Sequence, residues 1–144
     1  MTASQVFSIA NPVAMVGWII LIAAILLKRP FWRDEIAGRW FPLGLSALYS
    51  VLVVFFFFQA EGGFDSLENV QKLFTSPWAA LAGWVHYLAF DLFIGAFIAK
   101  RIMEAGLPRW PLVALLPMTF MFGPMGLAGF EIMKLTLGKS ETAK

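Results

Sequence analysis

One apolar run, WAALAGWVHYLAFDLFIGAFIA from Trp78 to Ala99, dominates the sequence of 144 residues. Roughly 20 apolar residues are needed to cross about 30 Å of hydrocarbon, so this run is long enough to span a bilayer. Two ionisable side chains, His86 and Asp91, lie near its centre. Because a carboxylate in the middle of a span costs about 2.5 to 3.5 kcal/mol on insertion scales, we expect Asp91 to have either a partner or a function.

The composition indicates an integral membrane protein. Hydrophobic residues make up 60% of the chain and charged residues 14%, whereas a soluble domain carries about a quarter charged residues. Cysteine is absent and histidine occurs once, which excludes disulfides, thiolate sites and multi-histidine metal sites within one chain, so no metal site is predicted. The formal net charge of +2 is too small for a nucleic-acid-binding face, and no nucleic-acid partner is expected.

Four apolar segments predict four membrane-spanning helices, near residues 6–27, 40–60, 77–99 and 110–133. Tryptophans lie near several of their ends, where an indole ring suits the membrane interface. The connecting segments are short and polar. The predicted fold is therefore a single domain over residues 1–144, an all-α integral membrane four-helix bundle with the lipid bilayer as its partner.

The basic residues predict the orientation, because Lys and Arg in short loops favour the cytoplasmic side. The first and third connections hold Lys28, Arg29, Arg33, Arg39, Lys100, Arg101 and Arg109, and the opposite side holds Lys72, Lys134, Lys139 and Lys144. Both termini are therefore expected outside the cytoplasm. The first apolar run has no Lys or Arg before it, so we expect a retained span and not a signal peptide.

Asp91 shares a helix face with a phenol. Tyr87 and Asp91 are four residues apart, so their side chains can meet across one helical turn. Gly83 and Gly95 extend this face at four-residue spacing, which lets another helix or a flat ligand approach the backbone closely. Two interpretations stay open: a helix-packing seam in which Tyr87 satisfies Asp91, or a ligand-binding face.

His86 lies five residues before Asp91, about 140° around a helix and roughly 7.5 Å along it. The two side chains are therefore not a preformed dyad. Either they flank one substrate between helices, or His86 faces a different neighbour. Imidazole is suited to proton transfer and to axial ligation, and the structural alternative is a neutral histidine hydrogen-bonded to an adjacent helix.

The other predicted helices offer partners at similar depth. Asn11 and Pro12 interrupt the first span, and Tyr49 lies midway along the second. A proline frees backbone groups that Asn11 or a ligand can satisfy. The fourth span carries Pro117 and then Gly123 and Pro124, and two prolines imply bending. We predict Asn11, Tyr49, Gly83, Trp84, Tyr87, Gly123 and Pro124 as ligand-binding residues.

Several cofactors do not suit these residues. Retinal bound as a Schiff base requires a lysine at mid-membrane, and Lys28 and Lys100 border the ends of their spans. A single histidine disfavours a di-iron site, and bis-histidine haem would need two protomers. A haem with His86 and Met118 or Met121 as ligands is a weaker alternative. No phosphate-binding glycine loop and no Ser-His-Asp pattern is present, so no cofactor is predicted.

The third and fourth predicted helices resemble a known family. The residues Trp84-Val-His86-Tyr-Leu-Ala-Phe-Asp91-Leu-Phe93, followed by Phe122-Gly-Pro124-Met-Gly126-Leu, are similar to the Trp-x-His, Asp-Leu-Phe and late Pro-x-Gly elements of the abscisic-acid-deficient-4-like family. The four-span layout and Asn11 also look similar. The resemblance therefore covers most of the chain.

The resemblance implies a membrane protein that handles carotenoids or related isoprenoids. Plant members are required for making neoxanthin from violaxanthin, a redox-neutral isomerisation that needs an acid and a base. By residue type, His86 and Asp91 fit these catalytic roles. The alternative is a non-catalytic subunit that binds pigment or assists assembly of a pigment-related complex, and a structural or transport subunit is a third hypothesis. A bacterial inner membrane and a homo-oligomer with a shared groove are also expected.

Overall fold

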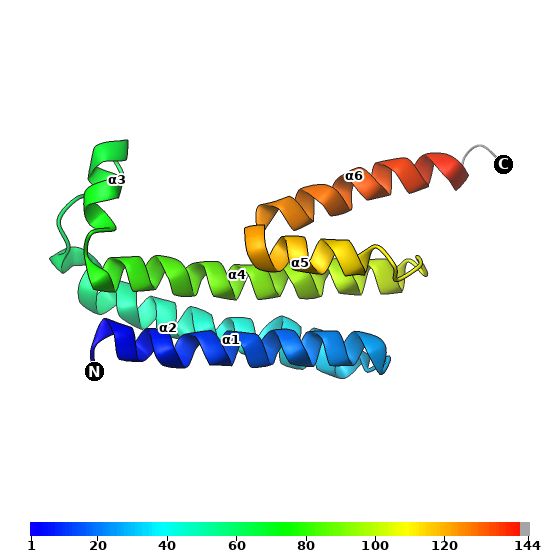
Figure 1. Ribbon diagram of the computed structural model, residues 1–144, viewed down its shortest axis with the longest axis horizontal. Coiled ribbons are helices and arrows are strands. Elements are labelled where there is room, and N and C mark those ends of the chain that lie inside the picture. The colour runs from blue at the N-terminus through cyan, green and yellow to red at the C-terminus, as the bar shows by residue number, and fades with distance from the viewer. Residues whose placement is uncertain (142–144) are drawn as a thin grey trace.

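The computed structural model describes residues 1–141 of the chain, and side chains as far as residue 136. Over residues 1–141 every regular secondary-structure element is a helix, which confirms the all-α prediction (Figure 1). The elements, in chain order, are α1 (Ala3–Leu26), η1 (Trp32–Trp40), α2 (Phe41–Phe56), η2 (Phe57–Gln59), α3 (Leu67–Leu73), α4 (Pro77–Glu104), α5 (Leu112–Phe122) and α6 (Pro124–Glu141). The π-helix η1 continues directly into α2.

Helix α4 is the centre of the fold. It packs against α1, α2, α5 and α6, and α1, α2 and α4 run side by side along the long axis (Figure 1). Within the described residues, three helical segments are long and apolar enough to cross a membrane: Ala3–Leu26, Trp32–Gln59 and Pro77–Glu104. Short α3 projects away from one end of this group (Figure 1). Three of the predicted spans thus correspond to continuous helical segments, and Pro12 does not break α1.

The fourth continuous helix, and with it the four-helix bundle, is not confirmed. The predicted span over residues 110–133 is divided into α5 and α6, which form a hairpin beside the second half of α4 (Figure 1). Gly123 leaves the helix with φ 47° and ψ −94°, a region open to glycine. Pro124 has no N–H and disfavours the α conformation in the residue before it, so a new helix begins there.

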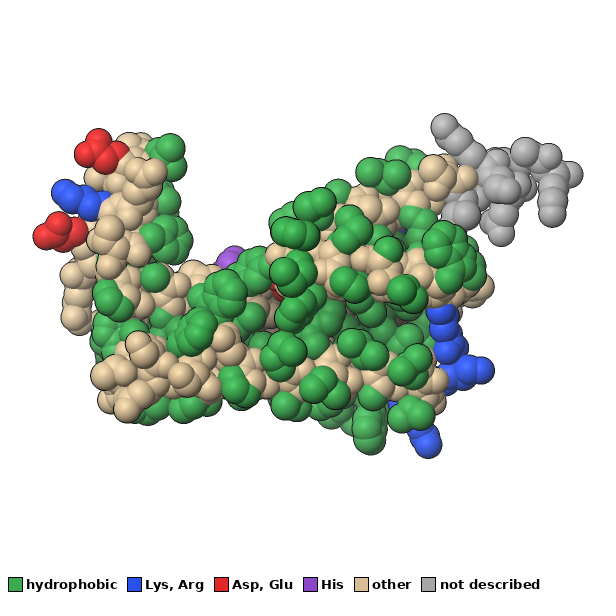
Figure 2. Space-filling view, in the orientation of Figure 1, with side chains coloured by type: hydrophobic (Ala, Val, Ile, Leu, Met, Phe, Trp, Pro, Cys, Tyr) green, Lys and Arg blue, Asp and Glu red, His purple; other side chains and the backbone are tan. Residues whose placement is uncertain are grey.

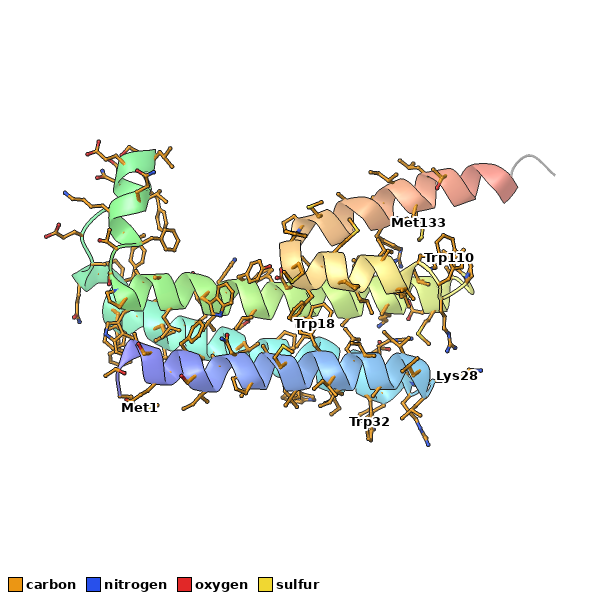
Figure 3. All side chains as sticks on the ribbon, in the orientation of Figure 1. Met1, Trp18, Lys28, Trp32, Trp110 and Met133 are labelled. Carbon is orange, nitrogen blue, oxygen red and sulfur yellow. The ribbon has the colours of Figure 1, made fainter. Side chains whose placement is uncertain are left out.

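The hairpin also places the end of α6 at the opposite end of the molecule from the N-terminus (Figure 1). The N-terminus lies at one end of the long axis and the end of α6 at the other (Figure 1). Lys28, Trp32 and Trp110 lie at the end toward which α6 runs, and Met1 lies at the opposite end (Figure 3). The expectation that both termini share one side is thus unsupported. Of the lysines behind it, Lys144 and the side chain of Lys139 lie outside the described residues.

Small residues allow α1 and α4 to approach closely. A β-carbon placed on Gly95 of α4 would lie 2.5 Å from Cη2 of Trp18 in α1. The Trp18 side chain is 4% exposed and meets Phe120 of α5 edge-on, with ring centroids 5.4 Å apart. The predicted glycine face is therefore a helix contact at Gly95, and Trp18 joins α1, α4 and α5.

Candidate functional site

Asp91 lies beneath the turn between α5 and α6. Asp91 is 4% exposed, and a β-carbon on Gly123 would collide with the carboxylate oxygen Oδ1 of Asp91. The other oxygen, Oδ2, is buried and has no hydrogen-bond partner in the described part of the chain. A buried polar atom without a partner is costly, so the fold places Oδ2 of Asp91 at this position at an energetic cost.

Tyr87 lies beside Asp91, one turn earlier in α4. Its hydroxyl donates to the backbone carbonyl oxygen of Phe120 at 3.3 Å. Asp91 follows one turn later on the same helix face, so this hydroxyl also lies beside the Asp91 carboxylate. The interpretation in which Tyr87 satisfies Asp91 therefore stays a prediction.

His86 faces a different neighbourhood. Its ring is exposed, stacks on Phe90 with centroids 4.6 Å apart and lies 5.3 Å from the ring of Tyr49 in α2. Among the described residues, no side chain or carbonyl forms a hydrogen bond with it. The alternative of a histidine satisfied by an adjacent helix is therefore not seen, and its nitrogens are open to a ligand.

Asn11 and Trp84 meet each other. The indole Nε1–H of Trp84 donates to Oδ1 of Asn11 at 2.7 Å, which joins α4 to α1. The Trp84 ring also stacks on Tyr87, with centroids 5.5 Å apart. The amide oxygen of Asn11 is thus engaged by α4 and not by the backbone near Pro12. Two predicted ligand residues form an interhelical contact.

The α5–α6 hairpin covers one face of α4 only along the second half of that helix, and the first half of the same face is open (Figure 1). Because α5 ends at Phe122, the surface is hollowed between α3 and the α5–α6 turn, and histidine lies in the hollow (Figure 2). Phe74, directly after α3, borders Gly83 at one side of this hollow. Trp84 and His86 are exposed and Tyr87 is half-buried. Gly83, Trp84, His86 and Tyr87 therefore share an open stretch of α4.

A groove of about 800 Å³ runs between η1, α2 and α4. Phe90, Phe93 and Phe97 of α4 line one wall, and Asp34, Glu35, Arg39 and Lys100 lie at its polar end. Because Phe90 also stacks on His86, the imidazole adjoins the apolar part of the groove. These three phenylalanines are not among the predicted site residues, although their spacing of three and four residues from one another places them on the His86 face of a helix.

The predicted site residues therefore form two groups around α4. His86 lies with Tyr49. The second group is a chain of contacts from Asn11 through Trp84 and Tyr87 to Asp91 and Gly123. Pro124 opens α6 beside Gly123. His86 and Asp91 have different neighbours, as the helical spacing predicts. In the described residues no group of three or more His, Cys, Asp or Glu side chains is placed to hold a metal ion.

These features define a class: an all-α protein whose described residues contain three helices long and apolar enough to cross a membrane, with a short α5–α6 hairpin over a buried carboxylate. The chain belongs to the ABA DEFICIENT 4-like family, whose sequence model matches residues 5–130. This match confirms the resemblance drawn from the Trp84–Phe93 and Phe122–Leu127 motifs.

One curated relative comes from fission yeast. An uncharacterized protein of Schizosaccharomyces pombe is 32% identical over 88 residues, which is 60% of this chain and 18% of that protein. The chain thus spans under a fifth of that relative's length. No solved structure matches the chain.

Proposed function

We propose that the protein is an integral membrane isomerase that binds a carotenoid or related isoprenoid along the open face of α4. The observation that carries this proposal is the exposed imidazole of His86, which stacks on Phe90 beside an aromatic groove and has no hydrogen-bond partner in the described chain. A long apolar ligand would cover the aromatic wall and bring its reacting end to the imidazole.

The proposed reaction is redox-neutral. A proton is added to a ligand oxygen as its C–O bond breaks, and another proton is removed from carbon, so that the C–H electron pair becomes a new double bond. We assign proton transfer to His86 and Asp91. His86 suits exchange with a ligand because its ring is open, whereas Asp91 lies five residues further along α4 and is buried beside Gly123.

The experiment compares His86→Ala and Asp91→Asn with Ser50→Ala in a carotenoid-producing host. Ser50 is a matched control because its hydroxyl donates to the Ser46 carbonyl of its own helix. Each protein is purified in mild detergent, its helical content measured, and its bound and converted isoprenoids identified by absorption and mass analysis. We expect both site variants to fold and to lose product by about 10²- to 10⁴-fold, the usual contribution of a proton-transfer group.

The outcomes separate the interpretations. Full turnover by either variant would remove that residue from the reaction. Pigment that co-purifies with the wild type, is lost in His86→Ala and is never chemically changed would replace catalysis with binding alone. A wild type carrying only bulk lipid and forming no product would contradict the proposal.

We also propose that α1, the segment from η1 to η2, and α4 cross the membrane, with the basic end in the cytoplasm. The end holding the first and third connections carries seven basic residues, and the opposite connection is acidic. With α6 folded back, its Lys134 joins the basic side, so the charge asymmetry becomes larger than a four-span layout gives. The bacterial inner membrane stays a prediction.

The absence of cysteine makes this orientation directly measurable. Single cysteines at Gln71, Ala105 and Thr136, all exposed, are treated in intact cells with a membrane-impermeant maleimide. We expect labelling at residue 71 only, and labelling at 105 and 136 after permeabilisation. If residue 136 is labelled together with residue 71, the last segment crosses the membrane and the hairpin is wrong.

A further inference from the structure

A second groove, of about 430 Å³, lies between α1 and α5, near the basic end of the molecule. Its walls are aliphatic except at the mouth, where Arg109 and Trp110 of the α4–α5 connection lie. The lining residues are Ile22, Ile25, Leu26, Arg109, Trp110, Leu112, Val113, Leu116 and Pro117. Unlike the groove beside His86, this one has no acidic residue in its lining.

Arg109 uses one of its hydrogen-bond donors on α1, and its other donors have no partner among the described residues. One N–H of its guanidinium donates to the carbonyl oxygen of Ile25 at 3.1 Å, in the last turn of α1. A guanidinium has five N–H donors in a planar fork. The Arg109 side chain is exposed and forms no ion pair with any described residue. Its remaining donors are therefore positioned at the groove mouth for an anionic group.

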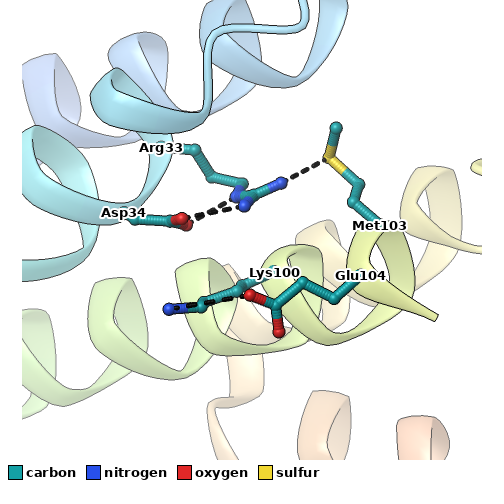
Figure 4. Close-up of polar contacts among 5 residues, drawn as sticks. All are labelled: Arg33, Asp34, Lys100, Met103 and Glu104. Atoms are coloured by element: carbon teal, nitrogen blue, oxygen red, sulfur yellow. Dashed lines mark hydrogen bonds and ion pairs between the residues drawn. The ribbon is translucent and has the colours of Figure 1, made fainter. Parts of the chain in front are cut away.

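The charges around the mouth favour an anion. The acidic side chains of η1 and of the last turn of α4 are each paired with a base at this end: Asp34 with Arg33 at 2.6 Å, Glu35 with Arg39 at 3.0 Å and Glu104 with Lys100 at 3.8 Å (Figure 4 shows the first and third pairs). Lys28, Arg29, Arg101 and Arg109 form no ion pair within the described chain. Lys and Arg side chains gather visibly at this end (Figure 2). The excess of unpaired positive charge lies beside an apolar slot.

We propose that the α1–α5 groove binds one anionic phospholipid, with an acyl chain between the helices and the phosphate on Arg109. Arginine matches phosphate geometry with two parallel hydrogen bonds, and basic residues at the membrane surface attract anionic lipids. Trp110, 70% exposed, suits the interface beside the headgroup. The lipid would join α1 to α5 and so support the hairpin that covers Asp91.

The test uses native mass spectrometry of the full chain, stripped of lipid in detergent and titrated with phosphatidylglycerol or phosphatidylcholine. We expect the wild type to retain one phosphatidylglycerol and Arg109→Gln to bind it about tenfold more weakly, the usual effect of losing a charge-assisted contact. Arg101→Gln is the matched control, because Arg101 is an exposed arginine at the same end but does not line the groove. Its binding should be unchanged.

A second pair of variants tests the slot itself and does not depend on Arg109. Val113 is 79% exposed and lines the groove, so Val113→Trp should fill it and release the lipid. Ala114→Trp, on an exposed neighbour outside the lining, should leave binding intact. Equal retention of both phospholipids, equal weakening by the two arginine variants, or unchanged binding in Val113→Trp would each overturn the proposal.

Discussion

Gly123→Val is expected to prevent the α5–α6 hairpin from closing over Asp91. Gly123 has φ 47°, where a β-branched residue is strained by about 1 to 3 kcal/mol. A β-carbon would also collide with Oδ1 of Asp91, and overpacking of this kind costs about 1 to 3 kcal/mol. The sum is a loss of about 2 to 6 kcal/mol in the free energy of unfolding, measured by denaturant titration in detergent.

Two other glycines separate these causes. Gly106 has φ 65° and nothing within 4 Å of a β-carbon, so Gly106→Ala measures the backbone cost alone. Gly44 in α2 has neither feature, and Gly44→Ala should be neutral or slightly stabilising because alanine favours helix. Gly123→Ala should cost more than Gly106→Ala, and the difference should shrink when Asp91 is alanine. Equal costs would mean that the carboxylate does not press on the turn.

Gly95→Ala is expected to separate α1 from α4. The added methyl group would lie 2.5 Å from Cη2 and 2.9 Å from Cζ3 of Trp18, and the buried indole cannot move freely because Phe120 lies against it. We expect a loss of about 1 to 3 kcal/mol in the free energy of unfolding, as for other overpacked cores.

A double-mutant cycle identifies the cause of this loss. Phenylalanine lacks the outer part of the indole ring, so Trp18→Phe leaves a void that a methyl group on residue 95 partly fills. The two substitutions together should therefore cost less than the sum of their separate costs, with a coupling of about 0.5 to 3 kcal/mol. Additive costs would show that Gly95 is needed for a reason other than the approach of Trp18.

The long apolar helices were predictable because hydropathy over 20 residues reports them directly. The break at Gly123 was not, since a hydropathy window records how apolar a segment is and not the direction in which it runs. The two prolines of the fourth segment indicated bending, but a reversal depends on the φ of Gly123 and on the space left by Asp91. Those are properties of the packed structure.

In the candidate site, too, some features could be predicted from the sequence and others depend on the packed structure. Helical spacing alone placed His86 and Asp91 on different sides of α4, and the structure agrees. Helical spacing could not reveal that Trp84 donates a hydrogen bond to Asn11, because these residues lie 73 positions apart in the sequence. Nor could helical spacing predict the hydrogen bond from the Tyr87 hydroxyl to Phe120, since the acceptor is a backbone carbonyl and the pattern of side chains does not indicate which carbonyls are within reach.

The short hairpin has a consequence for biogenesis. Helix α5 has 11 residues, about 16 Å of helix against roughly 30 Å of hydrocarbon, so it cannot be inserted as an independent span. We expect α1, α2 and α4 to enter the membrane first, and the α5–α6 limb to follow as one unit once α4 offers a surface for it. Until that last event Asp91 lies on an uncovered face of α4, where a polar side chain at membrane depth is costly, so the final step of assembly is also the one that shields this group from lipid.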